Sequence, residues 1–274
     1  MMIKCLRGVL VLMLVLGCSS LMTTQTLAQA LAQTPTSEIG IVIMHGKGGA
    51  PTNLVADLAT ALSDRGYRVS NLEMPWSGRR NYDVSTRVAE QEVETALAAL
   101  RAQGARRIFI AGHSQGGLFA LHLGSKVLVD GMIVIAPGGD VSSAFFQSKV
   151  GASVSLARTL IAAGKGEERA SFLDFEGSKG TSPVVTTATV YFDWFDPDGV
   201  MNQARAVKIF NARIPVLYIA PQGDYPALVR ANPPMYAMLP SNPQHRFYTP
   251  DTNHRNAPSA SIDEIVRWMT VVAQ

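Results

Sequence analysis

The amino-acid sequence predicts an α/β fold in which a mostly parallel central sheet is covered by helices on both faces. From Ser37 onward, short β-branched runs alternate with longer segments of helical periodicity, a pattern typical of such sheets. The chain has 274 residues, of which 47% are hydrophobic and 16% charged, so it can bury a substantial core. It shows no Gly-X-Y repeat, solenoid period, heptad run or low-complexity tract, which excludes collagen, coiled-coil and repeat architectures.

Individual strands and helices are predicted in order from apolar runs and from helical spacing. The run GIVIM at 40–44 suits a central strand, and further strands are predicted at 67–74, 107–111, 131–136, 215–220 and 246–249. Leucines at helical spacing predict a helix over 54–62, and further helices are predicted at 88–103, at 118–126 and from Ser261 onward. Gly66 and Gly104 end the first two helices, and the capping box Ser261-x-x-Glu264 begins the last one.

The regular alternation stops between Gly138 and about Arg213. A long interruption inside an otherwise regular sheet is usually an insertion on its rim. We therefore predict one domain over 33–274 with a cap-like insertion at about 139–212, and no second independent domain.

Residues 1–32 have the three-part layout of an export signal. Lys4 and Arg7 precede an unbroken apolar run at 8–17, and small and polar residues follow it. A spanning helix needs about 20 apolar residues, so this run is too short to be a transmembrane anchor. We expect the leader to be cleaved and the protein to be exported, as a periplasmic or secreted protein.

Two processing routes are open for this leader. Small-x-small sites at 28–30 and 30–32 predict cleavage to a soluble protein, which is the route we favour. The alternative is the segment VLGC at 15–18, which resembles a lipobox and would tether the protein to a membrane through Cys18. Because both cysteines, Cys5 and Cys18, lie in the leader, cleavage after alanine leaves no thiol for a disulfide or a nucleophile.

The charge balance argues against a nucleic-acid partner. The formal net charge is +3, from 24 Lys and Arg against 21 Asp and Glu, and two of those bases lie in the leader. The longest basic runs are the pairs at 79–80 and 106–107, whereas nucleic-acid binding usually shows a clustered basic face.

The sharpest motif is Gly-His-Ser-Gln-Gly at 112–116, which directly follows the predicted strand 107–111 and directly precedes a predicted helix. It is a G-x-S-x-G motif in the strand-turn-helix setting that such a motif requires. A serine on so tight a turn is strained, and small flanking residues let strand and helix approach closely. The turn would push the Ser114 hydroxyl out of the fold and put the Gln115 amide at a helix N-terminus.

This motif in its setting resembles the nucleophile elbow of the α/β-hydrolase family, and the resemblance extends from about Ile41 to the C-terminus. The segment His-Gly-Lys-Gly-Gly at 45–49, after the first strand, is similar to the family's H-G-x-x-G loop. The resemblance implies that Ser114 is the nucleophile and that the backbone amides of Lys47 and Gln115 form the oxyanion hole.

The family order of nucleophile, acid and base implies an acid and a histidine on later loops. Asp224 fits the acid because it follows the strand 215–220, and His254 fits the base because it lies between the last strand and the last helix. Asp198, with Asp196 beside it, stays open as an alternative acid. The remaining histidines are expected to be structural or to fix loops: His45, His113, His122 and His245.

Two further groups of residues have open alternatives. Trp194, in the aromatic cluster 191–195 of the insertion, is predicted to bind substrate in an acyl pocket, and the alternative is that the cluster packs the cap onto the body. Arg79 and Arg80 are expected to be solvated surface charges, and the alternative is recognition of an anionic group.

The chemistry is expected to need no cofactor and no metal. The sequence has no H-E-x-x-H motif, no cysteine pair outside the leader and no G-x-G-x-x-G after the first strand. We predict a serine hydrolase that cleaves small-molecule carboxylic esters or thioesters through an acyl-enzyme. Peptidase, lyase and acyltransferase reactions would use the same residues, and a non-catalytic binding protein on the same scaffold is the alternative from another class.

Overall fold

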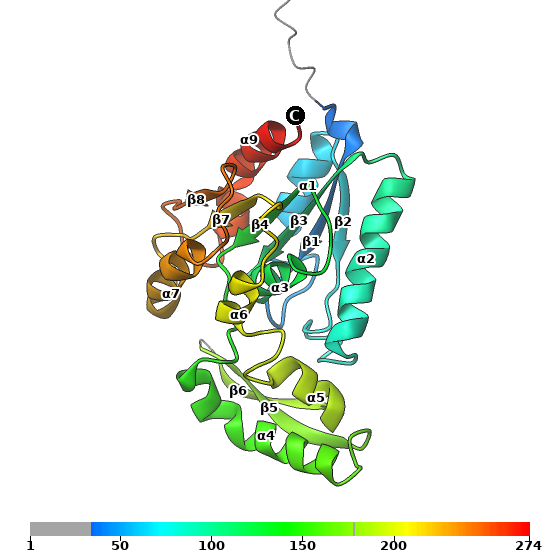
Figure 1. The fold of residues 1–274 in the computed structure, drawn as a ribbon, viewed down its shortest axis with the longest axis vertical. Helices are drawn as coiled ribbons and strands as arrows, with labels where there is room; N and C mark the ends of the chain where they lie inside the picture. The colour runs from blue at the N-terminus through cyan, green and yellow to red at the C-terminus, as the bar shows by residue number, and fades with distance from the viewer. Residues whose placement is uncertain (1–33, 178) are drawn as a thin grey trace, which may run out of the picture. The chain divides into compact units, whose positions relative to one another are not determined.

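A parallel sheet of six strands forms the centre of the described part of the chain (Figure 1). The computed structural model describes residues 34–177 and 179–274, so the predicted export signal and both cysteines lie outside the described residues. The strand order is β2-β1-β3-β4-β7-β8, and each neighbouring pair is parallel. The strands are β1 (Ile39–Met44), β2 (Arg68–Leu72), β3 (Arg107–His113), β4 (Gly131–Ile135), β7 (Val216–Ile219) and β8 (Arg246–Tyr248).

Helices cover both faces of this sheet, which confirms the predicted fold class. They are α1 (Ala56–Asp64), α2 (Thr86–Ala102), α3 (Gln115–Leu123), α8 (Ala257–Ala260) and α9 (Ile262–Val272). Alternate residues of β1 point to opposite faces, so Val42 packs in one core with α2 and α3, and Ile41 packs in the other with α1 and α9. Every residue of β1 is buried, which explains its unbroken apolar sequence.

The segment between β4 and β7 is an insertion between two neighbouring strands of the central sheet. It contains α4 (Ala144–Ala162), β5 (Arg169–Glu176), β6 (Gly180–Thr187), α5 (Ala188–Phe195) and α6 (Gln203–Lys208). Strands β5 and β6 pair as an antiparallel hairpin that is separate from the central sheet. Figure 1 shows α4, α5 and this hairpin together beyond one end of the sheet. Residues 33–274, with this insertion included, form one compact unit.

A further helix, α7 (Pro226–Ala237), follows β7 and has no counterpart in the sequence prediction. Pro226 lies in its first turn, where a missing N–H costs little, but Pro233 and Pro234 lie inside it. Within the described residues, no helix is both long and apolar enough to cross a membrane.

Candidate active site

Ser114 lies on the sharp turn between β3 and α3. Its φ is 54° and its ψ is −117°, a left-handed conformation that is costly for a residue other than glycine. The neighbouring glycines make the turn possible, because a Cβ at Gly112 would lie 2.0 Å from the Gly116 carbonyl oxygen. A Cβ at Gly116 would lie 2.6 Å from the carbonyl oxygen of Met44 in β1. Strand and helix therefore meet as closely as the sequence motif requires.

A chain of hydrogen bonds joins Ser114 to the two polar residues predicted from later loops. His254 Nε2 lies 3.0 Å from Ser114 Oγ, and His254 Nδ1 lies 2.7 Å from Asp224 Oδ1. Asp224 follows β7 and His254 follows β8, and an isolated bridge between Gly223 and Asn253 fixes the two loops side by side. With Nδ1–H donating to the carboxylate, Nε2 is free to accept the serine hydroxyl proton.

The alternative acid is not part of this chain of contacts. Asp198 is exposed, its amide is bonded to Asp196 Oδ1, and its carbonyl accepts a hydrogen bond from Arg205. Asp224 is 8% exposed, and its Oδ1 also accepts the Tyr225 amide at 2.7 Å. The structure thus brings Asp224, and not Asp198, to the histidine.

His113 makes a hydrogen bond that holds the main chain of His254. Its Nε2 donates to the backbone carbonyl of His254 at 2.9 Å, and the two rings lie 5.0 Å apart. Burial lowers the pKa of His113 to about 3, with the nearby His254 as a smaller cause. His113 therefore stays neutral near pH 7, where it keeps the Nε2 proton that this bond needs.

Residues 45–49 run beside Ser114. A Cβ at Gly46 would lie 3.0 Å from Ser114 Cβ, so the loop passes next to the serine. His45 shapes the loop, since its Nδ1 donates to the Gly46 carbonyl at 2.7 Å and its Nε2 accepts the Met74 amide at 3.0 Å. Among the described residues, the backbone amides of Lys47 and Gln115 have no acceptor. They are the two amides that the sequence predicts for the oxyanion hole.

Comparison with known proteins identifies the family of the chain. The profile of the Alpha/beta hydrolase family matches residues 41–270. The chain belongs to this family. A search of curated protein sequences found no match.

Solved structures with the same fold include several hydrolases. A highly thermostable carboxyl esterase from Bacillus coagulans, in complex with glycerol, is 15% identical, with a TM-score of 0.63 over 86% of this chain and 90% of that chain. A monoacylglycerol lipase from Paleococcus ferrophilus is 17% identical, with a TM-score of 0.59 over 88% and 96%. A putative hydrolase from Agrobacterium vitis S4 is 19% identical, with a TM-score of 0.58 over 88% and 91%. At these identities the likeness concerns the fold.

Trp194 of this α/β hydrolase packs inside the protein instead of facing a substrate cavity. It is 1% exposed, and its Nε1 donates to the Val84 carbonyl at 2.8 Å. Its ring meets those of Trp76, Tyr82 and Phe119 at 5.6 to 5.8 Å between centroids. The substrate-binding role predicted for Trp194 therefore needs correction, since this geometry is that of the packing alternative.

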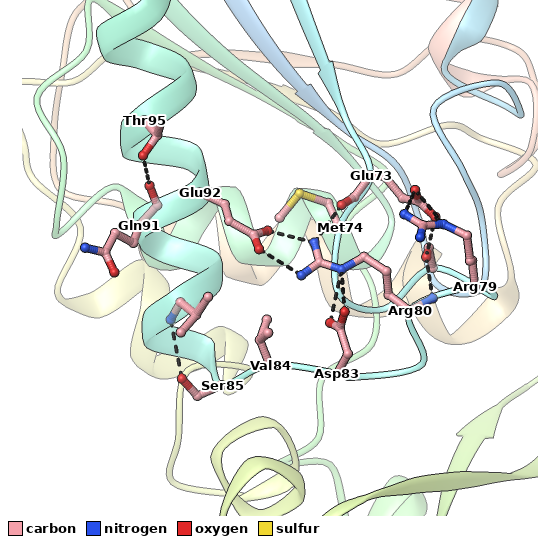
Figure 2. Close-up of polar contacts among 12 residues, drawn as sticks. Glu73, Met74, Arg79, Arg80, Asp83, Val84, Ser85, Gln91, Glu92 and Thr95 are labelled. Atoms are coloured by element: carbon pink, nitrogen blue, oxygen red, sulfur yellow. Dashed lines mark hydrogen bonds and ion pairs between the residues drawn. The ribbon is translucent and has the colours of Figure 1, made fainter.

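The two arginines after β2 are held by carboxylates of the same chain (Figure 2). Arg79 pairs with Glu73 and is mostly exposed. Arg80 is 11% exposed at its side chain and binds Asp83 at 3.0 Å and Glu92 at 2.7 Å. The Arg80–Glu92 pair joins the loop to α2, so Arg80 is not the solvated surface charge that the sequence predicts, whereas Arg79 is. Because carboxylates of the chain occupy both guanidinium groups, a structural role is favoured over recognition of an anionic substrate. In the described part of the hydrolase, no group of three or more His, Cys, Asp or Glu could hold a metal ion.

Proposed function

We propose that this α/β hydrolase is an exported serine hydrolase that cleaves small-molecule carboxylic esters or thioesters through an acyl-enzyme. The observation that carries the proposal is the hydrogen-bonded chain from Asp224 through His254 to Ser114, at 2.7 and 3.0 Å. A serine hydroxyl is a weak nucleophile until a positioned base accepts its proton, and in this hydrogen-bonded chain His254 is such a base.

In the first half of the reaction, Ser114 Oγ attacks the ester carbonyl while its proton passes to His254 Nε2. Asp224 keeps the imidazole in the tautomer that accepts this proton and stabilises the imidazolium. Collapse of the tetrahedral intermediate breaks the C–O bond, and His254 returns the proton to the leaving alcohol. Water then repeats the same steps on the acyl-enzyme and releases the acid.

The free amides of Lys47 and Gln115 would stabilise the negative charge of each tetrahedral intermediate. Such a donor is worth about 3 to 4 kcal/mol in the transition state. Its value depends on being in place before charge develops, because it then costs no reorganisation during the reaction.

Two proteins of similar fold are named as ester hydrolases, a carboxyl esterase and a monoacylglycerol lipase, and this supports carboxylic esters as the substrate class. Export is supported by the charged and apolar leader at 1–32. The mass of the processed N-terminus tests export, and we expect it to begin at Leu31 or Gln33. A lipid-modified Cys18 would instead indicate a membrane-tethered lipoprotein.

We expect the substitution Ser114→Ala to abolish hydrolysis of p-nitrophenyl esters of graded acyl length. Because members of a triad act as a unit, the loss should be several powers of ten in kcat. Circular dichroism should show the fold retained, and a fluorophosphonate probe should label the parent protein but not the variant. Equal, slow hydrolysis by both proteins would contradict the proposal and favour a binding protein.

A further inference from the structure

The Asp174 carboxylate of β5 lies at the junction of three chain segments. Its Oδ1 accepts from Lys47 Nζ at 2.5 Å, and its Oδ2 accepts from the Tyr82 hydroxyl at 3.0 Å. Asp174 is 5% exposed, and a carboxylate is costly to bury unless it is paired and hydrogen-bonded. Both of its oxygens meet that condition. The inserted hairpin is thereby joined to the loop 45–49 and to the loop that follows β2.

Tyr82 extends this contact to Gln115. A phenol has one proton, which Tyr82 donates to Asp174, so its oxygen accepts from Gln115 Nε2 at 3.3 Å. Burial raises the pKa of Tyr82 well above its usual range, which keeps the proton on the phenol. Tyr82 has a φ of 57°, and Thr186 of β6 holds its main chain by donating to its carbonyl at 2.9 Å. Both strands of the hairpin therefore secure Tyr82.

Lys47 is the one residue of the segment 46–49 that has a side chain, because the other three are glycines. Glycine leaves the backbone many conformations, and Gly48 has a φ of +62°. The Lys47 side chain is anchored at its tip by Asp174 and by the Phe175 carbonyl at 3.1 Å. This anchor adds a restraint at Lys47 to the main-chain hydrogen bonds of the loop, such as the one from the Gly48 N–H to the Trp76 carbonyl at 2.8 Å.

We propose that Asp174 is a positioning residue that fixes both oxyanion donors, which are backbone N–H groups. It holds the N–H of Lys47 through the ion pair with that residue's side chain, and the N–H of Gln115 through the bond from Tyr82 to the Gln115 side chain. The inference rests on the proposed function, since it assigns these amides to the oxyanion. Misplacing a reacting group by about 1 Å can cost about 10²-fold in rate, so restraint of the amides matters to catalysis. The insertion would then contribute to the chemistry and would not serve as a cover alone.

The substitution Asp174→Asn tests this role, because it removes the charge and keeps the size. We expect kcat for a short p-nitrophenyl ester to fall about 10- to 100-fold while KM stays within about twofold, the pattern of a lost transition-state interaction. Inhibition by an alkyl trifluoromethyl ketone, whose serine adduct carries an oxyanion, should weaken by the same factor. Inhibition by the corresponding alkyl methyl ketone, which forms no stable serine adduct, should stay unchanged.

Asp130→Asn is the matched control. Asp130 also pairs with a cation, Arg107 at 3.0 Å, and also accepts a backbone amide, from Ile108 at 2.8 Å. It precedes β4 and so lies at the amino edge of the sheet, away from Ser114. This variant should keep the parent kcat and the parent affinity for the ketone.

Lys47→Met provides a second test, which also applies if Asp174→Asn does not fold. It keeps the backbone amide and removes the other half of the ion pair, so it should lower kcat by a similar factor. The double variant should be no slower than the slower single variant, because both changes remove the same interaction.

The possible outcomes separate this inference from the proposed function. Hydrolysis that does not depend on Ser114 would refute the proposed function itself. Hydrolysis that depends on Ser114 but is equal in Asp174→Asn and Asp130→Asn would refute the positioning role alone. A lowered melting temperature with unchanged ketone affinity would assign Asp174 to stability, and a raised KM with unchanged kcat would assign it to substrate binding. Either result overturns the inference.

Discussion

Asp224 and His254 are 30 residues apart in the chain, and Ser114 is 140 residues from His254, yet hydrogen bonds join all three. Each residue lies in a loop that leaves the carboxyl end of a parallel strand. Such loops meet at one edge of an open α/β sheet. The chemistry proposed for the site thus depends on single side chains that strand geometry brings together.

Asp224→Asn tests the assignment of the acid. An amide at this position would favour the wrong histidine tautomer, and we expect kcat to fall by about 10⁴, the loss that the same change causes in another triad. Asp198→Asn, on the exposed loop of the insertion, is the matched control and should keep near-parent activity. The reverse ranking of the two variants would move the acid to Asp198.

His113 should make stability depend on pH. Its pKa is lowered from 6.5 to about 3 in the folded protein, chiefly by burial, so the unfolded chain binds a proton near pH 5 that the native protein excludes. The contribution of neutral His113 to the free energy of unfolding is therefore fully present above pH 6.5 and is lost as pH falls towards 3. Between pH 7 and pH 5 the free energy of unfolding should drop by about 2 kcal/mol from this group.

Urea unfolding at the two pH values measures this drop. The variant His113→Gln keeps an N–H donor for the His254 carbonyl and cannot titrate, so its decrease between pH 7 and pH 5 should be smaller by about 2 kcal/mol. An identical pH dependence in parent and variant would show that His113 is not the titrating group.

At the scale of elements, the central strands could be predicted because burial on both faces demands continuous apolar runs. The strand predicted at 40–44 corresponds to β1, whose residues are all buried. Helices α2 and α9 could be predicted because one apolar stripe faces the sheet. Helix α7 could not be predicted, because prolines interrupt its helical spacing of apolar residues. Its one fully buried residue among those described is Asn232, whose amide oxygen accepts from the Tyr218 hydroxyl at 2.9 Å. A tertiary contact replaces the missing apolar stripe.

The hairpin β5–β6 escaped prediction for a related reason. Its inward positions alternate, with Phe172 and Asp174 buried on β5 and Val184 and Thr186 buried on β6. The two polar residues at inward positions hide the period of two that marks a half-buried strand. They are the residues that bond to Lys47 and Tyr82. The network that supports the proposed oxyanion donors is thus invisible to local sequence patterns.

At the scale of the whole described unit, two apolar cores flank the sheet, one on each face. The strand-end loops that they position carry Ser114, which a sequence motif marks, and Asp224 and His254, which the family order and their places after predicted strands indicate. The contribution of the insertion could not be located in this way, because it depends on contacts between segments far apart in the chain. Asp174 and Lys47, for example, are separated by 127 residues.

The most direct test of the proposed catalysis is to locate the acyl group during turnover. The protein is quenched in acid while it hydrolyses a p-nitrophenyl ester, digested, and its peptides are weighed by mass spectrometry. We predict one acyl group per chain on the peptide that contains Ser114, formed with a burst of p-nitrophenol and absent from Ser114→Ala. Turnover with the acyl group on another residue, or with no acylated peptide at any time, would contradict the assignment of Ser114 as the nucleophile.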